Sequence, residues 1–209
     1  MDWGRKVDYT VVAVVGASVK PARLVYLQRW QGTGWETQAR EVAVICARFQ
    51  PWRILADGNS IGDPLAETLQ TEIGKAVREG PPAPNNGGVG TYPPAPSLGG
   101  KGLRVMPTVE RFTFGTESKG KLIDRLTLGL SGRALQYPAH RVLLSELWGF
   151  EYGAAGSSGR AKMGAKSGAH DDVVIALALA WFAAPEGAPV PMRQRILLGS
   201  QLGASRARA

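Results

Sequence analysis

The sequence predicts an α/β domain with a mixed central β-sheet flanked by helices. Short apolar stretches rich in β-branched residues come first, at residues 9–17 and 22–30, and are typical of strands. Segments with apolar residues every three or four positions follow and are typical of helices. Further short apolar stretches alternate with these helices. The length of 209 residues is enough for one domain with a full core.

The first half of the chain has the clearest pattern. After the two strands, glycines interrupt the sequence, and residues 35–49 are predicted to form a helix with one apolar face. Residues 53–56 are predicted to form a short strand that ends at Asp57. Apolar residues then recur every four positions, so a helix is expected over residues 63–78.

The second half is expected to alternate short strands with helices. The first expected elements are strands at 103–106 and 111–114, or one bent strand over both. They are followed by a helix from 116 or 118 to 132, a strand at 134–137, a helix at 140–147 and a strand at 150–152. A stretch rich in Gly, Ser and Ala leads from residue 153 to an uncharged apolar helix that begins at Asp171.

Composition changes separate two segments from the rest of the domain. Residues 80–102 hold seven glycines and six prolines in 23 positions, which predicts an exposed loop or a disordered insert. Prolines at 185, 189 and 191 mark a linker, and the chain from residue 192 onward contains arginines and no acid. We therefore expect one domain over residues 1–184, with an insert at 80–102, and a flexible basic tail at 185–209.

The net charge of +8 and the pI of about 9.9 suit a polyanionic partner such as nucleic acid. Plain solubility explains such a charge equally well. No apolar run approaches the roughly 20 residues of a membrane span, and the longest is at 173–184. Charged residues crowd the N-terminus, so no signal peptide is expected.

Cysteine and histidine are scarce. The chain has one cysteine, Cys46, and two histidines, His140 and His170. It can form neither an internal disulfide nor a thiolate zinc site, which fits a reducing compartment. Any metal would be bound mainly by oxygen, which favours magnesium, manganese or calcium over zinc.

Carboxylates at the ends of predicted elements form the candidate site. Asp57 ends a strand, Asp171 and Asp172 are adjacent at the start of the apolar helix, and Asp2 precedes the first strand. Ligand sites form at strand ends in open α/β sheets, so we expect these acids to converge. Converging carboxylates repel one another unless a cation lies between them. With two Mg²⁺ or Mn²⁺ ions about 3.5–4 Å apart, such a cluster would hydrolyse phosphodiesters.

Each acid also has a simpler interpretation. A lone Asp at a helix start, such as Asp171 or Asp172, is most often an N-cap. Asp57 before a glycine is commonly a turn residue. Asp2 could be an ordinary terminal charge. The order of the acids along the chain is more specific than any one of them.

Five short motifs resemble, in order and spacing, the nuclease domain of the large terminase subunit of tailed bacteriophages. They lie at residues 2–10, 56–63, 114–119, 146–147 and 170–172, and the similarity extends over about 2–184. The resemblance implies an RNase H-like (retroviral-integrase) fold. It also implies a two-metal endonuclease that cuts concatemeric viral double-stranded DNA during packaging.

The resemblance implies roles for the acids. Asp2 would be the ligand on the first strand, Asp57 the second ligand and Asp171 the ligand on the helix, together holding two Mg²⁺ or Mn²⁺ ions. These three would be the catalytic residues. Asp172 would be an auxiliary metal ligand or a support for the others.

Other residues in these motifs are interpreted as supporting groups. Asp8 would be structural or lie behind the ligands. His170 would orient a carboxylate or contact phosphate, with a purely structural role as the alternative. Glu146 is interpreted as a surface or buffering acid. Lys119 begins a helix, where a cation opposes the helix dipole, and this suggests phosphate binding, with a plain exposed lysine as the alternative.

Basic residues are expected to hold the DNA backbone by charge. They are Arg5, Lys6, Lys119, Lys162 and Lys166, together with the arginines of the tail. Such binding would be sensitive to salt and would position DNA without reading its bases.

The chain contains no GxxxxGK[ST] motif, so we expect no ATPase domain within it. The partners implied by the resemblance are double-stranded DNA, an ATPase motor domain, the small terminase subunit and the portal, in the host cytoplasm and without a membrane. Two alternatives stay open. One is a Holliday-junction resolvase-like nuclease with the same fold, and the other is a degenerate domain that serves as a DNA-binding or portal-docking module.

Overall fold

The computed structural model describes residues 1, 9–18, 20–59, 63–79, 107–152, 163–166 and 168–184. The predicted insert, the predicted tail and the predicted strand at 103–106 lie outside these ranges, so the domain boundaries stay predictions. The same holds for five candidate residues: Asp2, Arg5, Lys6, Asp8 and Lys162.

The first five elements agree with the predicted ranges to within about one residue. They are β1 (Thr10–Gly16), β2 (Ala22–Trp30), α1 (Trp35–Phe49), β3 (Arg53–Asp57) and α2 (Asp63–Glu79). Their periodic apolar positions account for the agreement, because buried faces repeat every two residues in a strand and every three or four in a helix.

The later elements agree less closely. They are β4 (Thr108–Phe112), α3 (Thr116–Ser131), β5 (Leu135–Gln136), α4 (Arg141–Gly149), β6 (Phe150–Tyr152), β7 (Met163–Ala165) and α5 (Asp172–Ala183). β4 lies three residues earlier than the predicted strand at 111–114. β7 was not predicted, because its Met-Gly-Ala sequence has no strand pattern and it is held by pairing with β6.

The strands pair in both directions, which confirms a mixed sheet. β1 and β2 are antiparallel, β2 and β5 are parallel, and β3 and β4 are parallel. In the described residues the strands form three groups, which are β1-β2-β5, β3-β4 and the antiparallel pair β6-β7. On β3, the N-terminal nitrogen of Met1 donates to the Leu55 carbonyl at 2.8 Å, and the Asp57 N–H donates to the Met1 carbonyl at 3.0 Å.

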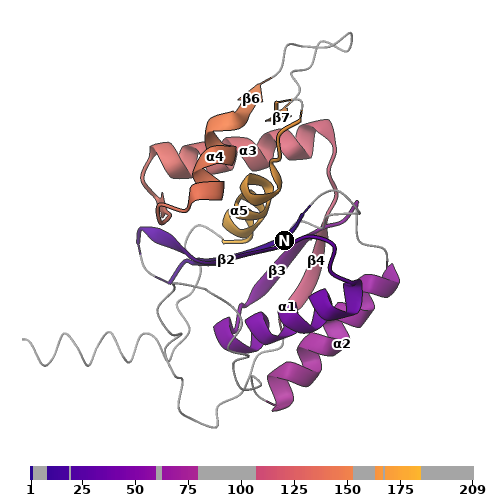
Figure 1. The fold of residues 1–209 in the computed structure, drawn as a ribbon. Helices are drawn as coiled ribbons and strands as arrows, with labels where there is room; N and C mark the ends of the chain where they lie inside the picture. Colours follow the sequence, from indigo (N-terminus) through magenta and orange to yellow (C-terminus); the bar gives the residue numbers. More distant parts are fainter. Residues whose placement is uncertain are drawn as a thin grey trace, which may run out of the picture.

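Strands β2, β3 and β4 lie between two groups of helices, whereas β6 and β7 lie beyond α3 and α4 (Figure 1). α1 and α2 cover one side, whereas α3, α4 and α5 lie on the other. Adjacent residues of β1 pack on opposite faces of the sheet. Val11 belongs to the core with α3 and α5, and Val12 belongs to the core with α1 and α2. The predicted layered α/β architecture is confirmed.

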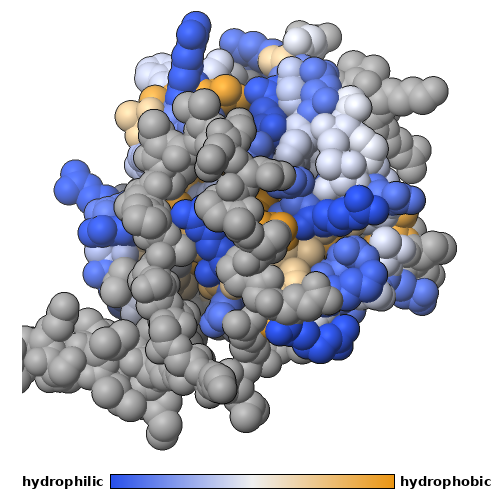
Figure 2. All heavy atoms as spheres, turned by 60° about the horizontal axis from the view of Figure 1, so that its bottom comes forward, coloured by the Kyte–Doolittle hydropathy of each residue, from blue (hydrophilic) through white to orange (hydrophobic). Residues whose placement is uncertain are grey.

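The described surface is mainly polar. Figure 2 brings the α1 and α2 side of the molecule forward and shows hydrophilic side chains over much of it, with small hydrophobic areas between them. Among the described helices, none combines the length and the apolar character that crossing a membrane requires.

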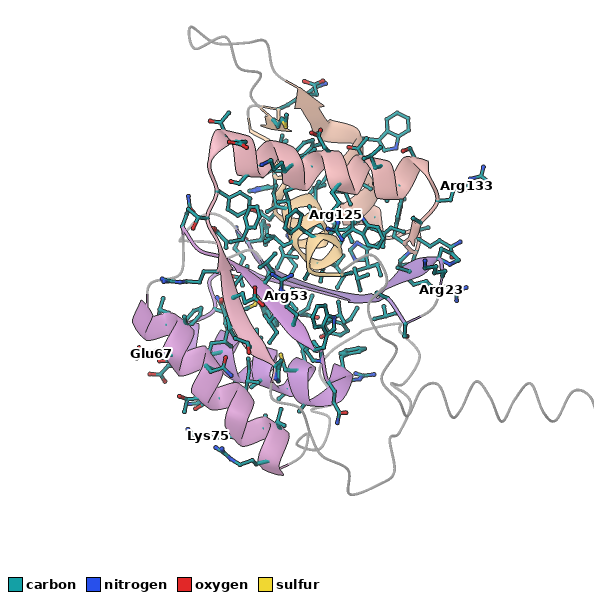
Figure 3. The ribbon with its side chains drawn as sticks, turned by 180° about the vertical axis from the view of Figure 1, so that it is seen from behind. Arg23, Arg53, Glu67, Lys75, Arg125 and Arg133 are labelled. Atoms are coloured by element: carbon teal, nitrogen blue, oxygen red, sulfur yellow. The ribbon has the colours of Figure 1, made fainter. Side chains whose placement is uncertain are left out.

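Helix α5 is buried along most of its length, and charged groups from two other helices hold its ends. At its start, Glu146 of α4 accepts hydrogen bonds from Val173 N and Val174 N at 2.7 and 3.3 Å. At its end, Arg125 of α3 donates to the Ala184 carbonyl, and Figure 3 shows Arg125 beside this helix. An acid at the N-terminus and a base at the C-terminus satisfy the end groups and complement the helix dipole.

The interpretation of Glu146 as a surface acid is therefore wrong. Its residue is only 7% exposed. The physical reason lies in α4, where Leu143 and Glu146, three residues apart, share the buried face of the helix.

Arg53 on β3 and Glu110 on β4 form a bidentate pair, with N–O distances of 2.8 and 2.6 Å. The hydrogen bond from Arg53 lowers the pKa of Glu110 below its usual 4.5. A carboxyl group whose pKa is lowered in the folded state stabilises the fold at pH values above its usual pKa. This contribution is lost as the pH falls through the lowered pKa. We expect Glu110→Gln to be less stable than wild type by up to about 1 kcal/mol at pH 7, because the pair is partly exposed.

Urea unfolding at pH 7 and at low pH measures this difference, which should shrink in acid. Glu67→Gln is the control, since Glu67 is exposed on α2 and points away from the domain in Figure 3. A difference that stays constant with pH would contradict the role given to the Arg53–Glu110 pair.

Candidate active site

Asp57 is a buried carboxylate at the end of β3, with 6% of its surface exposed. Its Oδ1 accepts a hydrogen bond from the Asn59 N–H at 2.8 Å, as expected for a turn residue. Among the described residues, no hydrogen bond is made by the other carboxylate oxygen. The turn therefore uses one oxygen and leaves the second for another ligand.

The turn after Asp57 is fixed against the segment that leads into α3. The Asn59 side chain exchanges two hydrogen bonds with the Phe114 backbone, at 2.8 and 3.0 Å. Gly58 lies so close to β4 that an added Cβ would be 3.0 Å from the Phe112 carbonyl oxygen. Asp57 is thus positioned relative to α3, although it does not contact that helix directly.

Asp171 occupies the N-cap position of α5, but its side chain makes no capping hydrogen bond. Instead, its Oδ2 lies 3.5 Å from Lys119 Nζ in the first turns of α3. The two side chains are 27% and 30% exposed, so both remain accessible to a ligand. The simpler interpretation of Asp171 as a helix cap does not hold.

The backbone of β7 passes close to this ion pair. A Cβ added to Gly164 would lie 3.2 Å from Asp171 Oδ2 and 3.9 Å from Lys119 Nζ. Only a residue without a side chain leaves the pair undisturbed at this position. Three elements therefore meet at Asp171: α3, α5 and β7.

Asp172 points to the start of β1. Its Oδ2 lies 3.4 Å from the Tyr9 N–H and 3.4 Å from His170 Nδ1. The rings of Tyr9 and His170 meet edge to face, with centroids 5.1 Å apart. The Tyr9 ring also contacts Arg29, whose guanidinium carbon lies 3.2 Å from the ring centroid. His170 is thus placed to orient a carboxylate, one of the two roles considered for it.

Glu146 is the functional candidate that sequence reasoning misjudged. Burial raises the pKa of its carboxyl, and the neighbouring Asp172 raises it further, whereas the α5 amides and Arg29 lower it. Its Oε1 is buried without a hydrogen-bond partner in the described part of the chain. A carboxylate at helical spacing from Leu143 on an apolar face was the signal that could have revealed it.

Among the predicted basic residues, two are described. Lys119 pairs with Asp171, as above. Lys166 pairs with Glu151 at 2.9 Å, and this hydrogen bond raises the pKa of Lys166. Lys166 thus has a close acidic partner at the surface, whereas the contact of Lys119 with Asp171 is longer.

Among the described candidate acids, Asp171 and Asp172 are neighbours in sequence at the start of α5, whereas Asp57 ends β3. No hydrogen bond or ion pair joins Asp57 to Asp171, and within the described ranges no three His, Cys, Asp or Glu side chains are grouped to hold a metal ion. Asp2 lies outside these ranges, while Met1 before it is hydrogen-bonded to the Asp57 backbone. The converging metal cluster stays a prediction.

Comparison with protein families gives no match. Two relatives are the large terminase subunits of Thermus virus P23-45 and of Thermus phage G20c, which are 26% and 25% identical to this chain over 180 residues. These alignments cover 86% of this chain and 30% of each relative. The chain thus spans about a third of the length of the curated relatives it matches.

Three solved structures are similar over most of the chain. The large terminase nuclease of phage G20c has a TM-score of 0.65 at 22% identity, covering 88% of this chain and 80% of that one. The same nuclease with bound magnesium has a TM-score of 0.64 at 23% identity, covering 87% and 77%. The large terminase nuclease domain of Thermus phage P74-26 has a TM-score of 0.52 at 19% identity, covering 83% and 78%. The predicted resemblance is confirmed: the chain has the RNase H-like fold of large terminase nucleases, and its relatives in sequence are large terminase subunits.

Proposed function

We propose that this chain is a divalent-metal-dependent DNA endonuclease that cuts concatemeric viral DNA during phage packaging. The observation that carries the proposal is the buried Asp57 at the end of a central strand, in a fold shared with a nuclease solved with bound magnesium. One oxygen of this carboxylate accepts from the Asn59 N–H, and a cation would satisfy the second, which makes no hydrogen bond in the described residues. The relatives named large terminase subunits support the link to packaging.

The donor set fits hard divalent ions, because every candidate ligand is a carboxylate. Asp57 and Asp171, with Asp2 and with Asp172 in support, would hold Mg²⁺ or Mn²⁺, in our proposal two ions. Bound ions of this kind supply electrostatic stabilisation of the negative charge that develops on phosphate, and a nucleophilic water at neutral pH. Cobalt and zinc complexes of the phage G20c nuclease support a site for divalent metals in this fold.

The protein's own side chains prepare this site. His170 Nδ1 and the Tyr9 N–H both face Asp172 Oδ2 and fix the direction of that carboxylate. Lys119 balances the charge of Asp171 and, through its exposed side, can contact a DNA phosphate. Asp8 is proposed to support the metal ligands without binding a metal ion itself. Arg5, Lys6, Lys162 and Lys166 are proposed to add attraction to the backbone that weakens with salt.

The wider role is also proposed by analogy with the relatives. An ATPase motor domain, the small terminase subunit and the portal would be partners in packaging, and the host cytoplasm would be the compartment. The chain spans only about a third of its curated relatives, so regulated cutting is proposed to need these partners.

A plasmid cleavage assay tests the proposal. Supercoiled DNA is incubated with the protein in Mg²⁺, in Mn²⁺ and in EDTA, and nicked and linear products are measured. We expect products with either metal and none with EDTA. Absence of cutting with both metals would refute the proposed endonuclease activity and would favour a DNA-binding or portal-docking module. A strong preference for four-way junctions over linear duplex would favour a junction resolvase instead.

Gly164→Ala is expected to slow cutting by roughly three- to tenfold, because the added methyl group would lie 3.2 Å from Asp171 Oδ2 and would push that carboxylate from its present position. The melting temperature should change little, since both side-chain ends are free to move. Gly149→Ala is the control, because an added Cβ at Gly149 meets no described atom within 4 Å. Equal cutting rates for the two variants would show that the close approach of Gly164 to Asp171 has no effect on cutting.

A further inference from the structure

Glu146 does for α5 what a residue at its own N-terminus would normally do. A capping side chain accepts hydrogen bonds from the second and third residues of a helix. In α5 these residues are Val173 and Val174, and both donate to Glu146 Oε2. The cap of α5 therefore comes from another helix, α4.

This arrangement releases the two acids at the start of α5. Asp171 stands at the N-cap position without capping, and its Oδ2 faces Lys119. Asp172 is held instead by Tyr9 and His170. The Asp171 carboxylate is therefore not used for the end of its own helix and faces Lys119 in the candidate site.

This arrangement matters because Glu146 and Asp171 would compete for the same two backbone amides of α5. Aspartate is among the best capping residues, and Asp171 stands at the N-cap position, with a backbone (φ −127°, ψ 10°) that would have to turn to the extended conformation of a capping residue before its side chain took the amides. Glu146 is only 7% exposed, and its backbone lies in the packed helix α4, so its side chain is held where it is. As long as Glu146 occupies the amides, Asp171 gains nothing by turning toward them.

We propose that Glu146 is a positioning residue, which holds the α5 amides and thereby keeps the Asp171 carboxylate turned toward Lys119 and the proposed metal site. The part that concerns metal rests on the proposed function. The competition between Glu146 and Asp171 for the amides can be tested without it.

Thermal unfolding without metal tests the competition in four proteins: wild type, Glu146→Ala, Asp171→Ala and the double variant. In the presence of Asp171, loss of Glu146 is partly compensated, because Asp171 takes over the cap. In the Asp171→Ala background no substitute exists, so loss of Glu146 should lower the melting temperature by about 3 °C more. The cavity left by Glu146→Ala is common to both backgrounds and cancels. Equal losses in both backgrounds would overturn the proposal.

Plasmid cutting and Mn²⁺ titration test the effect on the site. Glu146→Gln keeps an oxygen acceptor and should cut within about threefold of wild type, whereas Glu146→Ala should cut at least about tenfold more slowly and bind Mn²⁺ more weakly by calorimetry. Ile73→Val, which trims the other core, is the control for mild destabilisation and should cut at the wild-type rate.

Two results would count against the positioning role: equal impairment of the Gln and Ala variants, or full activity of the Ala variant. If wild type itself does not cut, the proposed function fails. The unfolding comparison then still decides whether Glu146 and Asp171 compete for the same amides.

Discussion

Asp57→Asn and Asp171→Asn are each expected to reduce metal-dependent plasmid cutting by at least about 100-fold while the domain stays folded. Each change removes one negative charge from the proposed ligand set, and loss of a few kcal/mol of metal-assisted stabilisation corresponds to such a factor. Asparagine retains an oxygen at the same position, so the hydrogen bond from Asn59 to residue 57 can persist. Cleavage rates in Mn²⁺ and circular dichroism measure the two effects.

Asp124→Asn is the matched control for these variants. Asp124 is an exposed residue of α3, the helix that also carries Lys119, and has no part in the proposed site. This variant should cut at the wild-type rate. If Asp57→Asn and Asp171→Asn both cut as fast as the control, these residues are not the metal ligands.

Gly129→Ala is expected to destabilise the domain by about 1–3 kcal/mol, in spite of the better helix propensity of alanine. A Cβ at this position would lie 2.5 Å from Trp181 Nε1 and 2.8 Å from Trp181 Cε2. The indole is a rigid group that also donates to the Arg125 carbonyl at 3.0 Å, so it cannot move aside without losing this bond. The contact between α3 and α5 therefore depends on the absence of a side chain at residue 129.

Urea or thermal unfolding measures this loss. Gly120→Ala, also inside α3, is the control, because the nearest atom to its added Cβ is the Met163 Cε at 3.9 Å. That variant should be as stable as wild type or slightly more stable, as helix propensity alone predicts. Gly129→Ala with unchanged stability would mean that α3 and α5 can separate at little cost.

Most of the fold was predictable because its patterns are local. The range 35–49 was predicted for a helix and is α1, since its apolar residues repeat along one face. β7 was missed because it consists of Met, Gly and Ala and forms through its pairing with β6. β4 begins earlier than expected because its burial alternates only weakly.

The sequence proposed a set of candidate site residues, which stays a prediction, but it could not give their geometry. The position of Asp57 at a strand end follows from local sequence. The orientation of Asp171 does not, because it depends on Glu146, which is 25 positions away and comes from a different helix. The contact of Asp172 with Tyr9 joins two residues that are 163 positions apart in the sequence. Long-range contacts of this kind have no counterpart in a pattern of neighbouring residues.

The way in which α5 is held sets an order of events during synthesis. Its two ends are fixed by Glu146 and Arg125, both of which precede it in the chain, and it is the last described element. Asp57 is therefore made long before the helix that carries Asp171 can dock. A nascent domain has no complete site until residue 184 has left the ribosome and α3 and α4 have closed on α5. Because Asp171 belongs to the proposed site, a chain truncated before α5 is expected to lack the proposed cutting activity.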